Sequence, residues 1–380
     1  MRTRLLLLAL LTSASGRAAA QASIFDIRGL GIPQAPLSAR AVGMGGSVGL
    51  LDGLSATNPA AITSVIGLTA GFNFFQNWRS STTPGGTGSA SDAGLPLVTV
   101  VNRVRETPWY FSGGFGSYTN RDFGVVTVGT TSVNGIPVQF KDSLQSLGGT
   151  SDLRLAVGYR RNKTLALGVG LHFITGSNRF FLSRTFSDSV LSPVRQRSEL
   201  AYNGIGVSVG AVYHPIEPLL LAGVVRRDGT LNVDRDSLSA YTFPLPWTFG
   251  GSAQYQLNRL TSLNAEFSYV TWSLASQDIV DAGGIGAEDT FRGSIGGEMA
   301  TSPVHPGTLP LRAGLRYAQL PFPLADGEQP SEFAVAAGTG ARFAKGHAAI
   351  DVALERVWRS SSGGFSEKAW ILTFGLTLKP

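Results

Sequence analysis

Large apolar side chains recur at every second position along most of this chain. From Leu165 to Phe173 they alternate with small or polar residues, and the same period of two runs from Trp370 to Leu378. Such alternation is typical of β-strands that present one face to an apolar environment. Helical periodicity is nearly absent beyond residue 65. The pattern therefore predicts an all-β fold for residues 66–380.

Fourteen segments of about ten residues carry this alternation, an even number of the length that bacterial outer-membrane barrels use. We predict from them a transmembrane antiparallel β-barrel of about 14 strands. Both chain ends of such a barrel lie on its periplasmic side. The predicted strands lie at 66–76, 94–104, 109–118, 150–160, 163–175, 199–213, 218–227, 247–257, 260–273, 286–300, 310–319, 332–344, 347–357 and 369–378.

The connections between these segments alternate in length almost without exception. Outer-membrane barrels have this asymmetry, because their periplasmic turns are short and their external loops are long. One connection, 301–309, is longer than the other turns of the short class. The tight turns are predicted at 105–108, 161–162, 214–217, 258–259 and 345–346, and the longest loops at 76–93, 119–150, 176–198 and 228–246.

Composition favours this barrel over a water-soluble β-sandwich, in which strands alternate in the same way. The chain has 48 Gly and only 15% charged residues, against roughly 25% charged in soluble domains. Just five of its 31 basic residues are Lys. We therefore expect the large residues to face lipid and the small or polar ones to face the lumen. Tryptophans are expected at the membrane interfaces, at Trp109, Trp247, Trp272, Trp358 and Trp370.

Residues 1–20 have the pattern of a cleaved export signal. Arg2 and Arg4 precede the short apolar run Leu5–Leu11, and an Ala-x-Ala site follows. We expect cleavage after Ala20, with Ala22 as the second choice. Loss of three arginines in this segment reduces the formal net charge from +6 to +3, which gives no reason to expect a nucleic-acid partner. With the barrel pattern, the signal predicts export to the outer membrane of a Gram-negative-type bacterium.

Residues 21–65 differ from the rest, being rich in Gly and Ala without a sustained period of two. They contain Ala39-Arg40-Ala41-Val42-Gly43-Met44-Gly45-Gly46, then Asp52, then Asn58-Pro59-Ala60. This series resembles the N-terminal signature of the FadL-type outer-membrane transport proteins, including their PorV-like branch. Weaker matches follow at Leu245-Pro246-Trp247 and at 310–317. The resemblance implies a fourteen-stranded barrel, an N-terminal hatch folded inside the lumen, and passage of hydrophobic molecules such as fatty acids or aromatic hydrocarbons.

Two sets of residues are candidates for functional positions. Glycine permits close packing of a hatch inside a barrel, and Pro59 restrains Asn58 to extended geometry at a turn. The predicted hatch residues are Arg40, Gly43, Met44, Gly45, Gly46, Asp52, Asn58, Pro59 and Ala60. Charges of both signs on the lumen face indicate internal ion pairs and hatch anchoring rather than a selectivity ring. They are Arg154, Arg160, Glu266, Arg292, Glu298, Arg312, Arg316, Asp351 and Glu355.

The sequence offers little for catalysis or metal binding. It contains no Cys, and its four His are widely separated, so the spacing of a metal site is missing. No nucleotide-binding or nucleophile-elbow motif is present. His172 is predicted to fill the lumen as a polar residue, and pairing with a serine such as Ser208 is not selected by any motif. We expect no enzyme activity, no metal and no cofactor.

The leading functional prediction is passive, hatch-gated uptake of hydrophobic molecules of the fatty-acid or hydrocarbon class. The expected partners are outer-membrane lipid and a hydrophobic small-molecule ligand. One alternative is a PorV-like barrel that receives or shuttles secreted proteins at the cell surface. A general porin is the third. A large apolar pocket behind the loops would favour transport. A blocked lumen with an exposed platform of loops would favour the shuttle, and an open polar channel would favour the porin.

Overall fold

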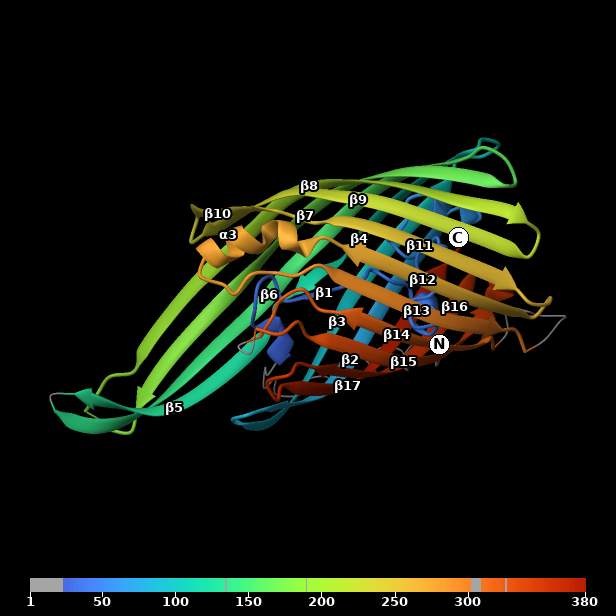
Figure 1. The fold of residues 1–380 in the computed structure, drawn as a ribbon. Coiled ribbons are helices and arrows are strands. Elements are labelled where there is room, and N and C mark those ends of the chain that lie inside the picture. The colour runs from blue at the N-terminus through green and yellow to red at the C-terminus, as the bar shows by residue number, and fades with distance from the viewer. Residues whose placement is uncertain (1–22, 134, 189, 302–308, 325–326) are drawn as a thin grey trace, which may run out of the picture.

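The computed structural model describes residues 23–133, 135–188, 190–301, 309–324 and 327–380. The predicted signal peptide at 1–20 lies outside these residues. Within them, fourteen antiparallel strands close into a barrel, because the last strand hydrogen-bonds the first along its whole length (Figure 1). This confirms the predicted fold class. The barrel strands are β2 (Thr69–Thr83), β3 (Gly86–Arg103), β4 (Trp109–Asn120), β6 (Ile136–Arg160), β7 (Leu165–Phe186), β8 (Val194–Ile216), β9 (Leu219–Arg235), β11 (Trp247–Gln256), β12 (Thr261–Val270), β13 (Thr290–Met299), β14 (Leu311–Gln319), β15 (Ser331–Phe343), β16 (Ala348–Ser360) and β17 (Ser366–Leu378).

Much of what the pattern assigned to long loops is strand. The expected loop 76–93 is the outer part of the β2–β3 hairpin, and 119–150 contains β5 (Phe123–Val133) and the start of β6. β10 (Leu238–Pro244) lies in the expected loop 228–246. The outer β2–β3 hairpin and β5 project beyond the barrel wall (Figure 1), and most of their residues are exposed. Alternation is weak there because neither face needs to be apolar, so the period of two could not find these strands. β10 differs, because its Phe243 packs into an apolar cluster with Trp272.

The two faces of the wall differ as predicted. Lipid-facing side chains such as Leu167 and Phe374 are exposed, whereas their neighbours Ala166 and Thr373 point into the lumen and are buried. The prediction that Trp272 lies at a membrane interface is wrong, because only 3% of its surface is exposed. The chain leaves the wall after β12 and folds into η3 (Trp272–Ala275) and α3 (Ser276–Asp281), which turns the indole inward.

The segment 23–65 lies within the barrel, and we refer to it below as the luminal segment. It contains η1 (Ile24–Asp26), β1 (Ile32–Pro33), α2 (Ala39–Val42) and η2 (Ala61–Ser64). Its backbone touches β14 on one side of the lumen and β7 on the opposite side, so it crosses the interior. None of the helices in the described ranges is long and apolar enough to span a membrane.

Candidate functional site

The carboxylate of Asp52 links Ser38, at the start of α2, to Ser55 in the turns after this helix. The side chain of Ser38 caps the helix, accepting from Ala41 N at 3.1 Å and donating to Asp52 Oδ2 at 2.5 Å. Ser55 Oγ donates to the same carboxylate oxygen at 2.7 Å and accepts from Ser38 N at 2.9 Å. A Ser at the N-cap satisfies a helical N–H that would otherwise be unpaired. The acidic residue of the predicted hatch series therefore organises the luminal segment from within.

Arg40 connects this helix to the wall through a chain of charges. Its guanidinium donates to both oxygens of Glu298 on β13, at 2.9 and 3.1 Å. Glu298 also accepts from Arg312 Nε on β14 at 2.6 Å, and Arg312 in turn donates to Asp351 on β16 at 2.6 Å. Bidentate arginine–carboxylate pairs fix geometry as well as charge. Four of the predicted site residues thus form one network between the luminal segment and three wall strands.

The glycine-rich turn after α2 packs directly on the wall backbone. Gly45 and Gly46 have positive φ, +66° and +88°, which glycine adopts without strain. Opposite them, a Cβ on Gly314 of β14 would lie 2.2 Å from the carbonyl carbon and oxygen of Met44. A Cβ on Gly43 would lie 3.1 Å from Cα of Gly338 on β15. Glycine is required on both sides because main chain meets main chain.

Asn58 and Pro59 form the second contact, on the opposite wall. Asn58 donates to Leu50 O at 2.8 Å and accepts from Ala60 N at 3.0 Å, and its side chain is fully buried. A Cβ on Gly168 of β7 would lie 2.4 Å from Pro59 C and from Ala60 N. The Asn-Pro-Ala turn is therefore held by close approach to the wall and by its own amide.

The remaining predicted lumen charges are used in different ways. Glu266 accepts from Leu50 N of the luminal segment at 2.8 Å, and Arg160 donates to Thr63 O. Arg316 pairs with Glu355 at 2.7 Å and with Glu332 at 3.1 Å, so opposite charges neutralise one another.

Besides Arg160, two of the predicted lumen arginines lack a carboxylate partner in the described part of the chain. Arg154 is 3% exposed, and its Nε and Nη2 have no hydrogen-bond partner there. Arg292 forms no ion pair among the described residues. The other predicted lumen charges apart from Arg160 take part in ion pairs or bind the luminal segment.

Sequence reasoning missed the part of this network nearest the long loops. Arg359 donates to Glu332 at 2.8 Å and to Glu367 at 2.5 Å. Arg226 bridges Asp152 and Asp228, at 2.7 Å each. Arg359, Glu367 and Asp228 lie one or two residues beyond the predicted strand ends, so extending the period of two would have found them. Glu332, Asp152 and Arg226 lie within predicted strands on the lumen face and were overlooked.

A cavity of about 570 Å³ lies between the luminal segment and the long-loop end of the barrel. Its lining is mixed, with an apolar part and a charged part. The apolar part comes from the luminal segment and from wall and loop residues, including Ile32, Ala35, Pro36, Leu37, Trp272 and Leu320. The charged part includes Arg79, Asp92, Arg226, Asp228, Arg292 and Arg359. The lumen is therefore neither fully filled nor an open polar channel at this level.

The cavity reaches a break in the barrel wall. β3 and β4 are hydrogen-bonded from Leu97 to the short-turn end, but the pairing stops there. Toward the long loops β3 pairs only with β2, with a register shift between Asn73 and Phe75. Pro96, next to the last paired residue, has no N–H to donate to a ladder. Residues on both edges of this break, among them Leu95, Pro96, Ser117 and Tyr118, line the cavity.

The luminal segment occupies the open edge of β4 beside this break. Ile32 and Pro33 of β1 pair with Asn120 and Thr119, and Gln34 N donates to Tyr118 O at 2.8 Å. Further along the segment, Pro36 lies close to Gly116 of β4. A Cβ added at Gly116 would be 3.1 Å from the Cβ of Pro36. The segment thus stands where β3 would otherwise pair.

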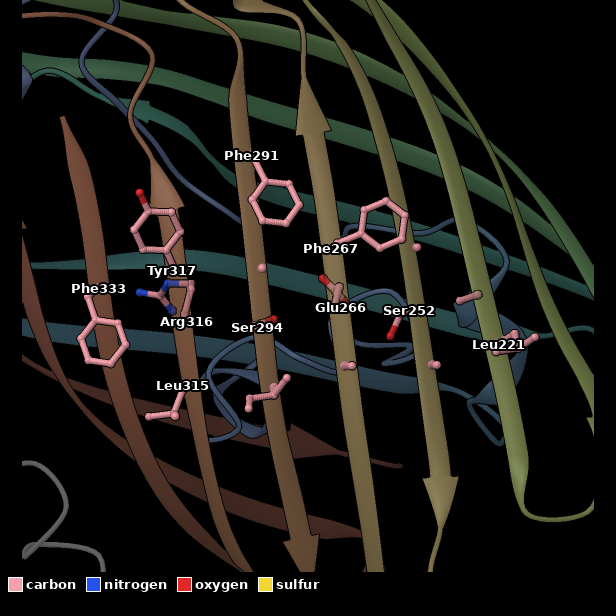
Figure 2. A pocket seen from close by; sticks show the side chains of 16 residues that line it. Leu221, Ser252, Glu266, Phe267, Phe291, Ser294, Leu315, Arg316, Tyr317 and Phe333 are labelled. Carbon is pink, nitrogen blue, oxygen red and sulfur yellow. The ribbon is translucent and has the colours of Figure 1, made fainter. Parts of the chain in front are cut away.

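A second hollow, a groove of about 750 Å³, lies on the lipid-facing side of β9 and β11–β15. Phe267, Phe291, Tyr317 and Phe333 surround it, and Glu266 and Arg316 point to the other side of the wall (Figure 2). The ladders of β11 with β12, β12 with β13 and β13 with β14 have no register shift. The groove is therefore a surface feature of the wall rather than an opening through it.

Asp152, His172 and Ser208 form a hydrogen-bonded series in the wall. His172 Nδ1 lies 2.8 Å from Asp152 Oδ2, and Nε2 lies 2.9 Å from Ser208 Oγ. The order matches that of a Ser-His-Asp triad. However, Ser208 and His172 are each 2% exposed, and neither lines the cavity. The series satisfies buried polar groups and gives a substrate no access to the hydroxyl.

These features define a class. A closed antiparallel barrel with an apolar outer face, a polar lumen, short turns at one end and long hairpins at the other has the architecture of a bacterial outer-membrane β-barrel.

Comparison with solved structures specifies the type. The chain resembles a Pseudomonas aeruginosa FadL homologue with a TM-score of 0.60 and 14% identity, covering 92% of this chain and 99% of that one. It resembles the Ralstonia pickettii toluene transporter TbuX (TM-score 0.59, 14% identity, 91% and 98% covered). It also resembles the Pseudomonas putida toluene transporter TodX (TM-score 0.59, 15% identity, 91% and 99% covered). No protein-family model and no curated protein sequence matches it significantly. At this identity the similarity establishes the FadL-type fold.

Proposed function

We propose that this protein is an outer-membrane channel through which hydrophobic small molecules pass without an energy source, gated by the luminal segment. The observation that carries the proposal is the cavity between the luminal segment and the long-loop end, which extends to the break between β3 and β4. A ligand would enter among the long loops, occupy the cavity, and leave when the luminal segment moves.

The lining of the cavity fits the fatty-acid or hydrocarbon class. Ala35, Pro36 and Leu37 offer apolar surface at the luminal segment. Arg292 also lines the cavity and has no ion-pair partner among the described residues. A fatty acid could place its carboxylate there, because arginine binds carboxylates in bidentate geometry. A neutral hydrocarbon would use the apolar lining alone, so Arg292→Gln should weaken binding of a fatty acid and leave binding of toluene unchanged.

The break supplies an exit at the depth of the lipid-facing belt. Phe74 and Trp78 on the adjacent strand β2 are 44% and 47% exposed at this level. An apolar ligand leaving between β3 and β4 would therefore enter hydrocarbon rather than water, which the hydrophobic effect favours. The stretch from Ile32 to Pro36 stands beside the edge of β4, so its movement would widen this exit.

The test is uptake of radiolabelled oleate and toluene by cells that make the protein. Ala35→Trp places an indole in the cavity, and Ala337→Trp, on the exposed outer face of β15, makes the same change outside it. We expect Ala35→Trp to abolish uptake and Ala337→Trp to leave it unchanged. Equal uptake by both variants would contradict the proposal. Steady ion conductance of the wild type would favour a porin, and co-purification of a secreted protein would favour the shuttle.

A further inference from the structure

The end of the barrel with the short turns is strongly basic. Its described residues carry nine Lys or Arg and only two Glu. Eight of the nine are exposed, and the ninth, Lys379, is half-buried. An excess of positive charge on the rim creates an electrostatic field that extends about 10 Å at 0.1 M salt. The basic residues are Arg103, Arg105, Arg160, Arg161, Lys163, Arg259, Arg342, Lys345 and Lys379, and the acidic ones are Glu106 and Glu217.

Five of these cations lie on two neighbouring turns, which we call the basic turn pair: residues 103–109 and 159–164. The turns are side by side, because Arg160 N donates to Pro108 O at 2.9 Å. Arg103, Arg105, Arg161 and Lys163 form no ion pair with any described residue, and neither does Arg160. Their charge is therefore not neutralised within the described part of the protein.

Both turns have a fixed backbone. Asn162 Oδ1 accepts from Thr164 N at 2.9 Å and from Leu165 N at 2.7 Å. Thr107 Oγ1 donates to Val104 O at 2.9 Å, and Arg103 Nε donates to Thr107 O at 3.3 Å. The cations are held together by ordered turns, which reduces the entropy lost when they bind a common ligand.

The basic turn pair borders the lipid-facing surface. Trp109 and Tyr159, with ring centroids 4.8 Å apart, lie at the strand ends next to the turns. Trp109 is 45% exposed, and lipid-facing Phe111 and Leu167 follow on the same wall. Aromatic pairs of this kind lie at the level of lipid headgroups. The turns are therefore at the depth where lipid phosphates lie. Arg105, Arg161 and Lys163 are exposed on them, whereas Arg103 and Arg160 lie over the ring of the buried Tyr110 and add their charge from the lumen side.

We propose that the basic turn pair is a binding site for the phosphate of an anionic phospholipid in the leaflet at the short-turn side. Cations at headgroup depth attract anionic lipid, while the adjacent aromatic and aliphatic surface contacts its acyl chains. A soluble polyanion would contact the cations but not this apolar surface. The lipid would hold this side of the barrel at a fixed depth, whether or not the protein transports anything.

Native mass spectrometry of the full chain in mixed micelles tests the site, with phosphatidylglycerol and phosphatidylcholine of equal chain length. The triple variant Arg105→Gln, Arg161→Gln, Lys163→Gln removes three charges and retains Arg103 and Arg160, which bond to backbone carbonyls. The matched control Lys141→Gln, Arg195→Gln, Arg197→Gln removes three exposed charges from the projecting hairpins. A shift in electrophoretic mobility between heated and unheated samples on SDS gels checks that both variants are folded barrels.

Each cation near an anionic surface contributes about fivefold to binding. We therefore expect the preference for phosphatidylglycerol over phosphatidylcholine to fall at least tenfold in the triple variant and to persist in the control. An unchanged preference in the triple variant, or an equal loss in the control, would overturn the proposal. Displacement of the lipid by an equal concentration of glycerol phosphate would indicate a site for free phosphate. Displacement by heparin alone would indicate a site for a soluble polyanion. Either result would overturn the proposal of a phospholipid site.

Discussion

Removing the carboxylate that joins the luminal segment to the wall should loosen that segment and leave the barrel closed. In Glu298→Gln, Arg40 loses its ion pair and at least one of its two hydrogen bonds, at 2.9 and 3.1 Å, because one carboxylate oxygen becomes an amide group that cannot accept. Arg312 also loses the charge of Glu298 but keeps Asp351 at 2.6 Å, and the ladder between β13 and β14 is unaffected. The change therefore acts on the contact between the segment and the wall.

The size of this loss in docking free energy depends on how deeply Arg40 and Glu298 are buried. Breaking a buried ion pair by removing one partner destabilises by about 3–5 kcal/mol. The side chains of Arg40 and Glu298 are 35% and 22% exposed, so water replaces part of the lost interaction. We expect about 2 kcal/mol against docking of the segment, which corresponds to roughly a 30-fold rise in the fraction undocked.

Cysteine labelling can measure this fraction, because the chain contains no native Cys. Met44 is fully buried at the contact with β14, so Met44→Cys should react with a water-soluble maleimide only when the segment undocks. Adding Glu298→Gln should accelerate the reaction about 30-fold. The control Glu288→Gln, on an exposed loop, should leave the rate unchanged. A rate within twofold of the parent in Glu298→Gln would refute the anchoring role of this pair.

Four further predictions concern the wall, the Asp152–His172–Ser208 series and Asp26 of the luminal segment. Gly314→Ala should accelerate labelling of Met44→Cys, because its Cβ would lie 2.2 Å from the Met44 carbonyl, whereas Gly113→Ala, with no atom nearer than 3.9 Å, should not. Leu171→Arg should destabilise the barrel by about 2–4 kcal/mol in urea titrations in bilayers, because exposed Leu171 lies about 13 Å further along β7 than Leu167, toward the middle of the lipid-facing belt; Leu167→Arg, opposite Tyr159 at headgroup depth, should cost only about 0–1 kcal/mol. A neutral effect of Leu171→Arg would contradict its lipid-facing assignment. A fluorophosphonate probe should fail to label Ser208 in folded protein, and labelling lost in Ser208→Ala would show access that its 2% exposure does not provide. Burial raises the pKa of Asp26 well above its usual value, so its contribution to stability is present at low pH and is lost as the pH rises through the folded-state pKa; unfolding midpoints should fall with pH in the wild type and less in Asp26→Asn, and identical profiles would contradict this.

The sequence could predict the barrel because the bilayer imposes its own pattern. Wherever the wall contacts lipid, one face must be apolar, so strands such as β7 and β17 show a period of two. Where the hairpins leave the bilayer this requirement ends, and the pattern did not detect β5 or β10. Trp272 was misplaced for a related reason, since a strand-end position does not reveal that the next loop folds back over the mouth.

The candidate site was predictable in its residue types but not in its pairings. Gly43 to Gly46 indicated close packing, and the structure places that turn against glycines of β14 and β15. No spacing indicated that Arg40 pairs with Glu298, which is 258 residues away. The break between β3 and β4 was not predicted either, because Pro96 alone does not distinguish a gap from an edge.

The most direct test of the central claim is a reversible tether between the luminal segment and the edge of β4. In the pair Pro36→Cys and Gly116→Cys the Cβ atoms start 3.1 Å apart, and a shift of a few tenths of an ångström brings them to the roughly 3.5–4.5 Å of a disulfide. Uptake of radiolabelled toluene and oleate is measured with the bond oxidised and again after reduction. The proposed gating predicts no uptake while the bond is intact and recovery to the wild-type rate after reduction. Equal uptake in both states would show that hydrophobic molecules do not need the luminal segment to move, and would contradict the mechanism.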